Sequence, residues 1–185
     1  LYSSAASDVY KRQTLWSDAP VSHIVVTPPV PSFPLNPDKA NWSVWDFPDV
    51  VDHWNFPGYE GKKMTVSVYS NCEQVELFLN GESLGKQENT ADKKNTLVWE
   101  VPYAHGILKA VSYNKGGEVG TATLESAGKV EKIRLSADRT EIVADGNDLS
   151  YITLELVDSK GIRNQLAEEL VKALPVASIT ITQKK

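Results

Sequence analysis

The stretch from Lys62 to Gly85 constrains the fold most, because it contains two consecutive runs in which apolar and polar residues alternate. The apolar members of these runs are Met64, Val66, Val68, Val75, Leu77 and Leu79. Alternation with a period of two is typical of β-strands that bury one face. Asn80-Gly81 follows the second run and tolerates the positive φ angles of a type I′ hairpin turn. We therefore predict an antiparallel β-meander here.

Further short strands follow this stretch. Residues 96–102, 106–114 and 119–124 are rich in apolar and β-branched residues, and Lys115-Gly116-Gly117 forms a turn signal between the last two. Before the meander, residues 23–27 are able to pair as an edge strand. Strands at spacings of roughly 8 to 12 residues are typical of a β-sandwich. We predict an all-β fold with antiparallel sheets.

Composition excludes several classes of protein. The chain of 185 residues has 41% apolar and 23% charged residues, which is ordinary for one large or two small globular domains. Its net charge of −5 argues against a nucleic-acid partner. The sequence contains no apolar run near the ~20 residues that cross a bilayer, so we expect no membrane partner. The single cysteine, Cys72, excludes an intrachain disulfide.

We expect neither a cofactor nor a metal site. Residues 145–148, Asp-Gly-Asn-Asp, carry oxygen ligands but lack the distal Glu of a calcium loop, so they indicate a turn. His23, His53 and His105 lie far apart in the sequence, and no serine near them sits in a nucleophile motif. Cys72 has no neighbour in sequence that would lower its pKa, and we expect an inert thiol.

Composition also suggests a division into segments. Residues 1–13 resemble a translated sequencing adapter, and we interpret them as a non-native leader. Residues 14–40 contain six prolines and predict an extended strap. Residues 41–126 then form the predicted sandwich. Residues 129–185 form a second module that we expect to be incomplete, because its last alternating run has no partner strand after it.

The second module shows strand patterns at residues 130–137 and 151–157. Only residues 164–174 have apolar residues at helical spacing, and this window is short. The fold prediction is therefore a tandem of antiparallel, Ig-like β-sandwich domains, the second of them incomplete.

A family resemblance emerges from longer motifs. Residues 52–62, DHWNFPGYEGK, together with residues 66–71 and 75–85, resemble the β-sandwich domain that follows the catalytic barrel in family 2 glycoside hydrolases, bacterial β-galactosidases above all. The similarity covers residues 14–126. From Val130 onwards the chain resembles a bacterial Ig-like domain of the invasin type, through residues 133–137, 144–146 and 152–158.

This resemblance implies a parent enzyme that hydrolyses terminal β-linked sugars with retention. Such enzymes use two glutamates, which in this family lie at strand ends of a (β/α)₈ barrel. We expect that barrel upstream of Leu15, so we assign no catalytic residue in this chain and predict that the chain alone is inactive. The leading hypothesis is an accessory region that supports the barrel, its partner in the same polypeptide. The resemblance also implies a periplasmic or secreted protein whose signal lies upstream.

Two alternatives remain open. The aromatic residues Trp45, Trp54, Phe56 and Tyr59 lie among polar neighbours, as in sites where a sugar stacks on a flat ring, which would make the region a carbohydrate-binding module for an oligosaccharide. Packing in the core or against the barrel is the more common role of such rings. Exposure of Trp54 and Phe56 would favour sugar binding, and burial would favour packing. The third alternative is an Ig-like adhesion or spacer module.

Overall fold

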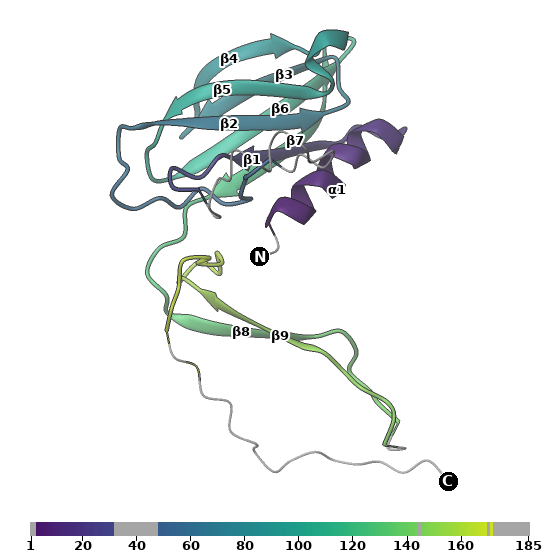
Figure 1. The fold of residues 1–185 in the computed structure, drawn as a ribbon, viewed down its shortest axis with the longest axis vertical. Helices are drawn as coiled ribbons and strands as arrows, with labels where there is room; N and C mark the ends of the chain where they lie inside the picture. Colours follow the sequence, from purple (N-terminus) through teal and green to yellow (C-terminus); the bar gives the residue numbers. More distant parts are fainter. Residues whose placement is uncertain (1–2, 32–47, 144–145, 170, 172–185) are drawn as a thin grey trace, which may run out of the picture. The chain divides into compact units, whose positions relative to one another are not determined.

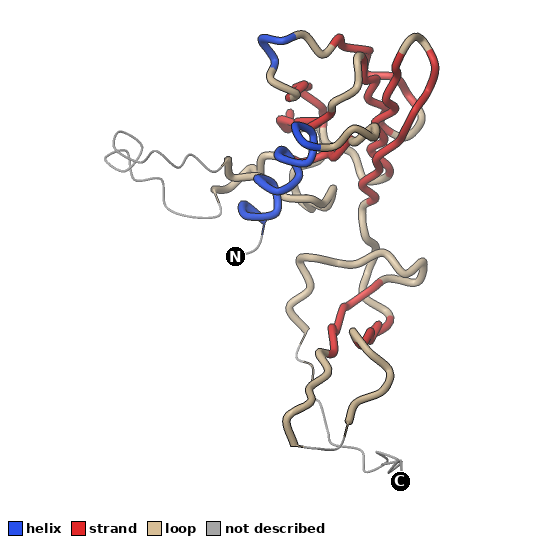
Figure 2. The backbone as a smooth tube through the Cα atoms, turned by 90° about the vertical axis from the view of Figure 1, so that its right-hand side faces the viewer, coloured by secondary structure: helices blue, strands red, loops and turns tan. Residues whose placement is uncertain are grey.

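The computed structural model describes residues 3–31, 48–143, 146–169 and 171, with the side chains described from residue 8 onwards. The chain divides into two compact units, Leu1–Ser126 and Ala127–Lys185, and each is described by itself. Strands dominate the regular structure of both units (Figures 1 and 2). The predicted all-β, antiparallel class is confirmed.

The first unit is built from two antiparallel sheets (Figure 1). One sheet has the order β1-β2-β5, and the other has the order β4-β3-β6-β7. The strands are β1 (Ser22–Val26), β2 (Lys63–Ser70), β3 (Gln74–Leu79), β4 (Glu82–Glu88), β5 (Thr96–Pro102), β6 (Ile107–Asn114) and β7 (Gly117–Glu125). A helix, α1 (Ser3–Trp16), and a 3₁₀ turn, η1 (Ala91–Lys93), complete the unit. The edge strand expected at residues 23–27 is confirmed as β1.

The predicted meander is wrong in one respect, because β2 and β3 belong to different sheets. Strand β2 pairs with β1 and β5, whereas β3 pairs with β4 and β6. The link at residues 71–73 carries the chain from one sheet to the other. Alternation shows that a strand has one buried face but carries no information about its neighbour. The Asn80-Gly81 turn is confirmed, with φ angles of 52° and 87° at its two residues.

The core fills the space between the two sheets. Inward-facing residues of both sheets interdigitate there, as sandwich cores do. The largest side chains that are completely buried are Trp54, Leu77, Leu97 and Leu108. The tryptophan comes from the irregular stretch before β2, so the family-like motif at residues 52–62 contributes to the same core as the strands.

Helix α1 lies mostly in residues 1–13, for which the sequence predicts no structure, and its last turn shows that the predicted extended strap is wrong for residues 14–16. Its Tyr10 ring stacks on His23 of β1, with centroids 4.4 Å apart. Thr14 is buried, and its backbone carbonyl accepts a hydrogen bond from the Asn95 side chain at 3.1 Å. The interpretation of residues 1–13 as a non-native leader concerns their origin and stays a prediction.

The described residues of the second unit form one antiparallel pair, β8 (Lys132–Ala137) and β9 (Ile152–Val157), which confirms the two predicted strands. Leu135 lies opposite Leu154 in this pair, and both side chains are exposed. The helix considered at residues 164–174 does not form in residues 164–169, where residues 165–166 make a turn. The remainder of that window, except residue 171, lies outside the described residues.

Candidate functional site

The predicted aromatic site is largely a packing cluster. Trp54 is 0% exposed and Phe56 is 7% exposed. Both rings meet the ring of Tyr103 edge to face, with centroids 5.0 and 5.7 Å away. The indole Nε1 of Trp54 donates to the carbonyl of Ala104 at 2.9 Å, and the Phe56 N–H donates to the Tyr103 hydroxyl at 3.0 Å. Buried indoles and phenols usually find such partners.

This burial corrects the carbohydrate-binding expectation for Trp54 and Phe56, because a ring must show a face to solvent before a sugar stacks on it. Tyr59 is half-buried against the core, and the Lys62 ammonium lies 4.6 Å from its ring centroid. Sugar binding at Tyr59 stays a prediction. Trp45 lies outside the described residues, and so does the prediction made for it.

The polar members of the same motif also have structural contacts. The backbone N–H of Asn55 donates to Nδ1 of His53 at 3.3 Å, and the His53 ring lies 4.9 Å from the ring of Phe56. The hydroxyl of Ser126, at the end of β7, donates to the backbone carbonyl of Trp54. The Ser126 contact fastens the motif to the residue that follows the last strand of the first unit. Its residues therefore serve the packing of the sandwich.

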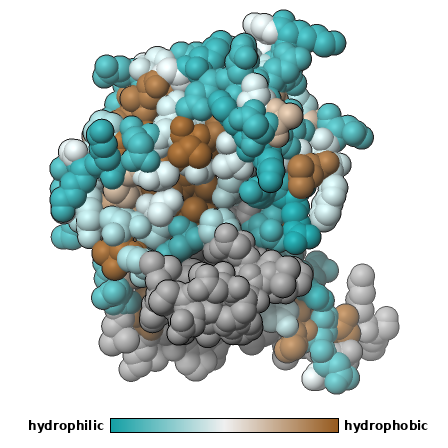
Figure 3. All heavy atoms as spheres, turned by 45° about the horizontal axis from the view of Figure 1, so that its top comes forward, coloured by the Kyte–Doolittle hydropathy of each residue, from teal (hydrophilic) through white to brown (hydrophobic). Residues whose placement is uncertain are grey.

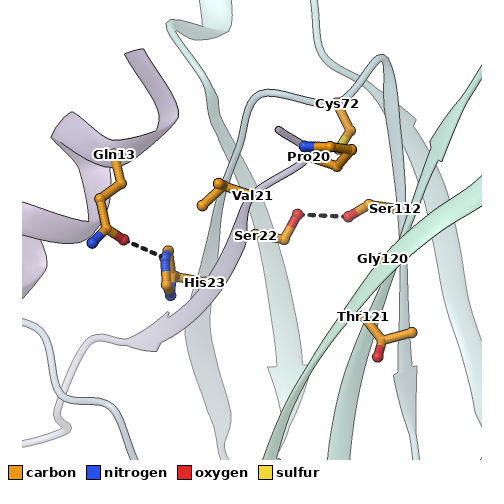
Figure 4. Close-up of a pocket in the computed structure, with 9 residues that line it drawn as sticks. All are labelled: Gln13, Pro20, Val21, Ser22, His23, Cys72, Ser112, Gly120 and Thr121. Atoms are coloured by element: carbon orange, nitrogen blue, oxygen red, sulfur yellow. Dashed lines mark hydrogen bonds between the residues drawn. The ribbon is translucent and has the colours of Figure 1, made fainter. Parts of the chain in front are cut away.

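A hollow of about 330 Å³ lies beside β1 (Figure 4). The Ser22 hydroxyl is hydrogen-bonded to the hydroxyl of Ser70 at 2.7 Å and to that of Ser112 at 2.6 Å. His23, the next residue, points the other way and bonds Gln13 at 2.9 Å (Figure 4). Successive side chains of a strand point to opposite faces, so β1 separates this histidine from its neighbouring serine.

This arrangement does not form a nucleophilic couple. A catalytic serine needs a base within hydrogen-bond reach, whereas the hydroxyl partners of Ser22 are Ser70 of its own sheet and Ser112 of the opposite sheet. Burial lowers the pKa of His23 and so favours its neutral form. Cys72 also lines the hollow, but its side chain is buried, as suits an inert thiol. The hydroxyl groups of Ser22, Ser70 and Ser112 therefore form a polar contact between the sheets, which we call the serine seam.

A larger hollow, of about 580 Å³, lies on the sheet β4-β3-β6-β7. Its lining comes from β3, the Asn80-Gly81 turn, β6 and the start of β7. The residues are Phe78, Asn80, Gly81, Ile107, Lys109, Val111, Tyr113 and Glu118. Sequence reasoning missed this group because Phe78 and Tyr113 occupy positions that alternate with buried residues. The signal in the sequence was an aromatic residue at a strand position whose side chain points away from the core.

The described residues include no group of three His, Cys, Asp or Glu side chains that could hold a metal ion. Asp148 of the acidic turn accepts from Arg139 at 2.6 Å and from the Val143 N–H at 2.8 Å. Asp145 lies outside the described residues. Among the helices described, none is long and apolar enough to cross a membrane. On the face shown in Figure 3, hydrophobic residues form separate patches among hydrophilic ones.

Two family models match the chain. Residues 61–120 match a domain of unknown function, DUF4982, and residues 133–174 match "Glycoside hydrolase family 2 C-terminal domain 5". The second match covers most of the stretch that resembles an invasin-type Ig-like domain. A curated relative, the β-galactosidase BoGH2A of Bacteroides ovatus, is 33% identical over 134 residues, which is 72% of this chain.

Solved structures show the same relationship. A glycosyl hydrolase family 2 member from Bacteroides cellulosilyticus is 98% identical with a TM-score of 0.84 over 85% of this chain. A β-glycosidase from Bacteroides vulgatus is 29% identical with a TM-score of 0.63 over 85% of this chain. The chain spans only 15% of the B. ovatus protein, and 20% and 17% of the two solved chains.

Proposed function

The chain carries C-terminal domains of the family 2 glycoside hydrolases, and from this we propose that it is a non-catalytic region that supports the barrel of a β-galactosidase-type hydrolase. The observation that carries the proposal is the small share of each relative that the chain matches. The chemistry of a retaining hydrolase would then belong to the remainder of the polypeptide. The proposal includes the periplasmic or secreted location that the family resemblance implies.

The contacts of the glutamates support a non-catalytic role. Retaining glycosidases place two carboxyl groups about 5 to 5.5 Å apart beside the scissile bond. In the first unit, Glu100 accepts from the Thr65 hydroxyl at 2.8 Å, and Glu76 accepts from the Ser83 hydroxyl at 2.6 Å. In the second unit, Glu155 pairs with Arg134 at 2.8 Å. These carboxylates stabilise neighbouring strands, as cross-strand polar pairs do.

The first unit also has the construction of a rigid support. Its core is closed between two sheets, and the serine seam joins the sheets at one end. A domain with its own core keeps its shape when it packs on another domain. We propose that the barrel packs on this sandwich and gains stability from it. Binding to the folded state alone always adds stability in this way.

The experiment uses the B. cellulosilyticus relative, whose sequence is nearly identical over this region. The region that corresponds to this chain is deleted, and turnover of nitrophenyl β-glycosides and the melting temperature are compared with those of the intact enzyme. We expect a lower melting temperature and faster thermal inactivation, with KM unchanged while the enzyme stays folded. Unchanged melting temperature and inactivation rate would refute the supporting role. Turnover of a β-galactoside by residues 1–185 alone would refute the non-catalytic role.

A further inference from the structure

The larger hollow has an apolar floor on the outer face of sheet β4-β3-β6-β7. Val111 and Tyr113 of β6 point away from the core, because the intervening Ser112 bonds Ser22 of the opposite sheet. Val111 is only 5% exposed despite its outward position, whereas Ile107, at the start of the strand, is 43% exposed. The larger side chains around Val111 therefore shield it. Phe78 of β3 lines the same floor.

The ring of Tyr113 is fixed in place by polar contacts. Its hydroxyl donates to Glu76 at 3.3 Å, and Glu76 in turn accepts from the Ser83 hydroxyl at 2.6 Å. The Lys86 ammonium lies 3.5 Å from the ring centroid, which is a cation–π contact. A ring held by two neighbours, Glu76 and Lys86, loses little freedom when a ligand packs against it, and such preorganisation favours binding.

The charged groups at the rim of the hollow balance one another. Lys109 and Glu118 line the hollow, while Lys86 and Glu76 flank Tyr113, so the two cations and two carboxylates balance. Thr123 lies directly opposite Lys109 in the β6–β7 register and is exposed. Directly opposed residues of antiparallel strands share a face, so the Thr123 hydroxyl lies on the same sheet face as Lys109, next to the hollow. The site thus combines donors and acceptors without a net charge.

We propose that this surface, which we call the Tyr113 shelf, binds a neutral oligosaccharide. The half-buried rings of Phe78 and Tyr113 match the C–H face of a pyranose, with Lys86 already on one face of the Tyr113 ring, and the charged rim matches the hydroxyl groups of the sugar. Balanced charges favour a neutral sugar over an anionic one, because neither sign is attracted. The volume of about 580 Å³ lies in the usual range of small-molecule sites. The shelf would hold substrate chains beside an enzyme, independently of the supporting role proposed above.

The test is calorimetric titration of residues 1–185 with cellotetraose, β-1,4-galactotetraose and xylotetraose. We expect at least one of these probes to bind with a Kd that is millimolar or tighter. Tyr113→Ala and Phe78→Ala should each weaken that binding at least about tenfold, because central aromatic residues dominate most binding energies. Tyr113→Phe should keep binding within about threefold, since the ring remains. The matched control is Tyr151→Ala, which removes an exposed tyrosine of the second unit and should leave binding unchanged.

Circular dichroism verifies the fold of each variant. If Tyr113→Ala does not fold, Glu118→Ala at the rim takes its place, with weaker binding expected. Several outcomes overturn the proposal: no neutral probe binds, Tyr151→Ala weakens binding as much as Tyr113→Ala, or tetragalacturonate binds and the neutral probes do not. Sedimentation that shows a dimer dispersed by Tyr113→Ala would also overturn it, because the shelf would then be an interface between two copies.

Discussion

Replacement of Trp54 by alanine tests how far the family-like motif holds the sandwich together. The side chain is 0% exposed, and truncation of a buried tryptophan typically costs 3 to 5 kcal/mol, so we expect about 4 kcal/mol from lost packing. The variant also leaves the Ala104 carbonyl without its indole donor, which adds about 1 kcal/mol. The expected loss of unfolding free energy is therefore about 5 kcal/mol. Small domains have only about 5 to 15 kcal/mol in total.

The assay is urea unfolding of residues 1–185, monitored by far-UV circular dichroism. Trp54→Phe keeps an aromatic ring but removes the indole N–H and leaves a smaller cavity than alanine does; we expect a loss of about 2 kcal/mol. Trp16→Ala is the control, since this ring is 74% exposed and its removal should change stability by less than about 0.5 kcal/mol. A loss below about 2 kcal/mol for Trp54→Ala would refute the packing role assigned to this ring.

Two further substitutions test local geometry. Gly106→Ala should destabilise the first unit by about 2 kcal/mol or more, because φ is 141° and the added Cβ would lie 1.9 Å from Oδ1 of Asn80. The control is Gly120→Ala, where the added Cβ has open space, and it should be nearly neutral in the same urea assay. Similar losses for both glycines would contradict this explanation. The hydrogen bond from the Gly128 N–H, with others from the following turn, lowers the pKa of Asp158. The ionised Asp158 carboxylate therefore stabilises the folded state fully above the ordinary Asp pKa, and this stabilisation is lost as the pH falls through the lowered pKa of the folded state. Asp158→Asn should reduce hydrogen-exchange protection of the Gly128 N–H at neutral pH, with a difference that shrinks in acid; an equal difference at both pH values would contradict the role of the charge.

The strands were predictable because their signals are local. Alternation marks β2 and β3, and Asn80-Gly81 marks the hairpin that joins β3 to β4. The assignment of β2 and β3 to different sheets was not predictable, because strand pairing depends on residues distant in sequence. The link at residues 71–73 has the length of an ordinary hairpin loop and yet crosses between sheets.

The candidate site was predictable only in part. The concentration of aromatic residues in the sequence drew attention to Trp54 and Phe56. Aromatic residues occur both in cores and in binding sites, however, so only the structure shows that these two rings are buried. Tyr113 was overlooked for the opposite reason, since an isolated aromatic residue in the outward phase of β6 looks like an ordinary surface residue. Its significance depends on Glu76 of β3 and Lys86 of β4, which reach it across the sheet.

The link between the two sheets contains the chain's only cysteine, and this makes Cys72 a natural reporter of motion. Its backbone N–H donates to the Ser70 hydroxyl at 3.1 Å, and that hydroxyl is hydrogen-bonded to Ser22, so the link is tied to the serine seam while its thiol is buried. A thiol reagent reaches a buried cysteine only when the surrounding structure opens. The rate at which Cys72 is alkylated therefore reports how readily the structure around residues 71–73 opens, without any engineered label.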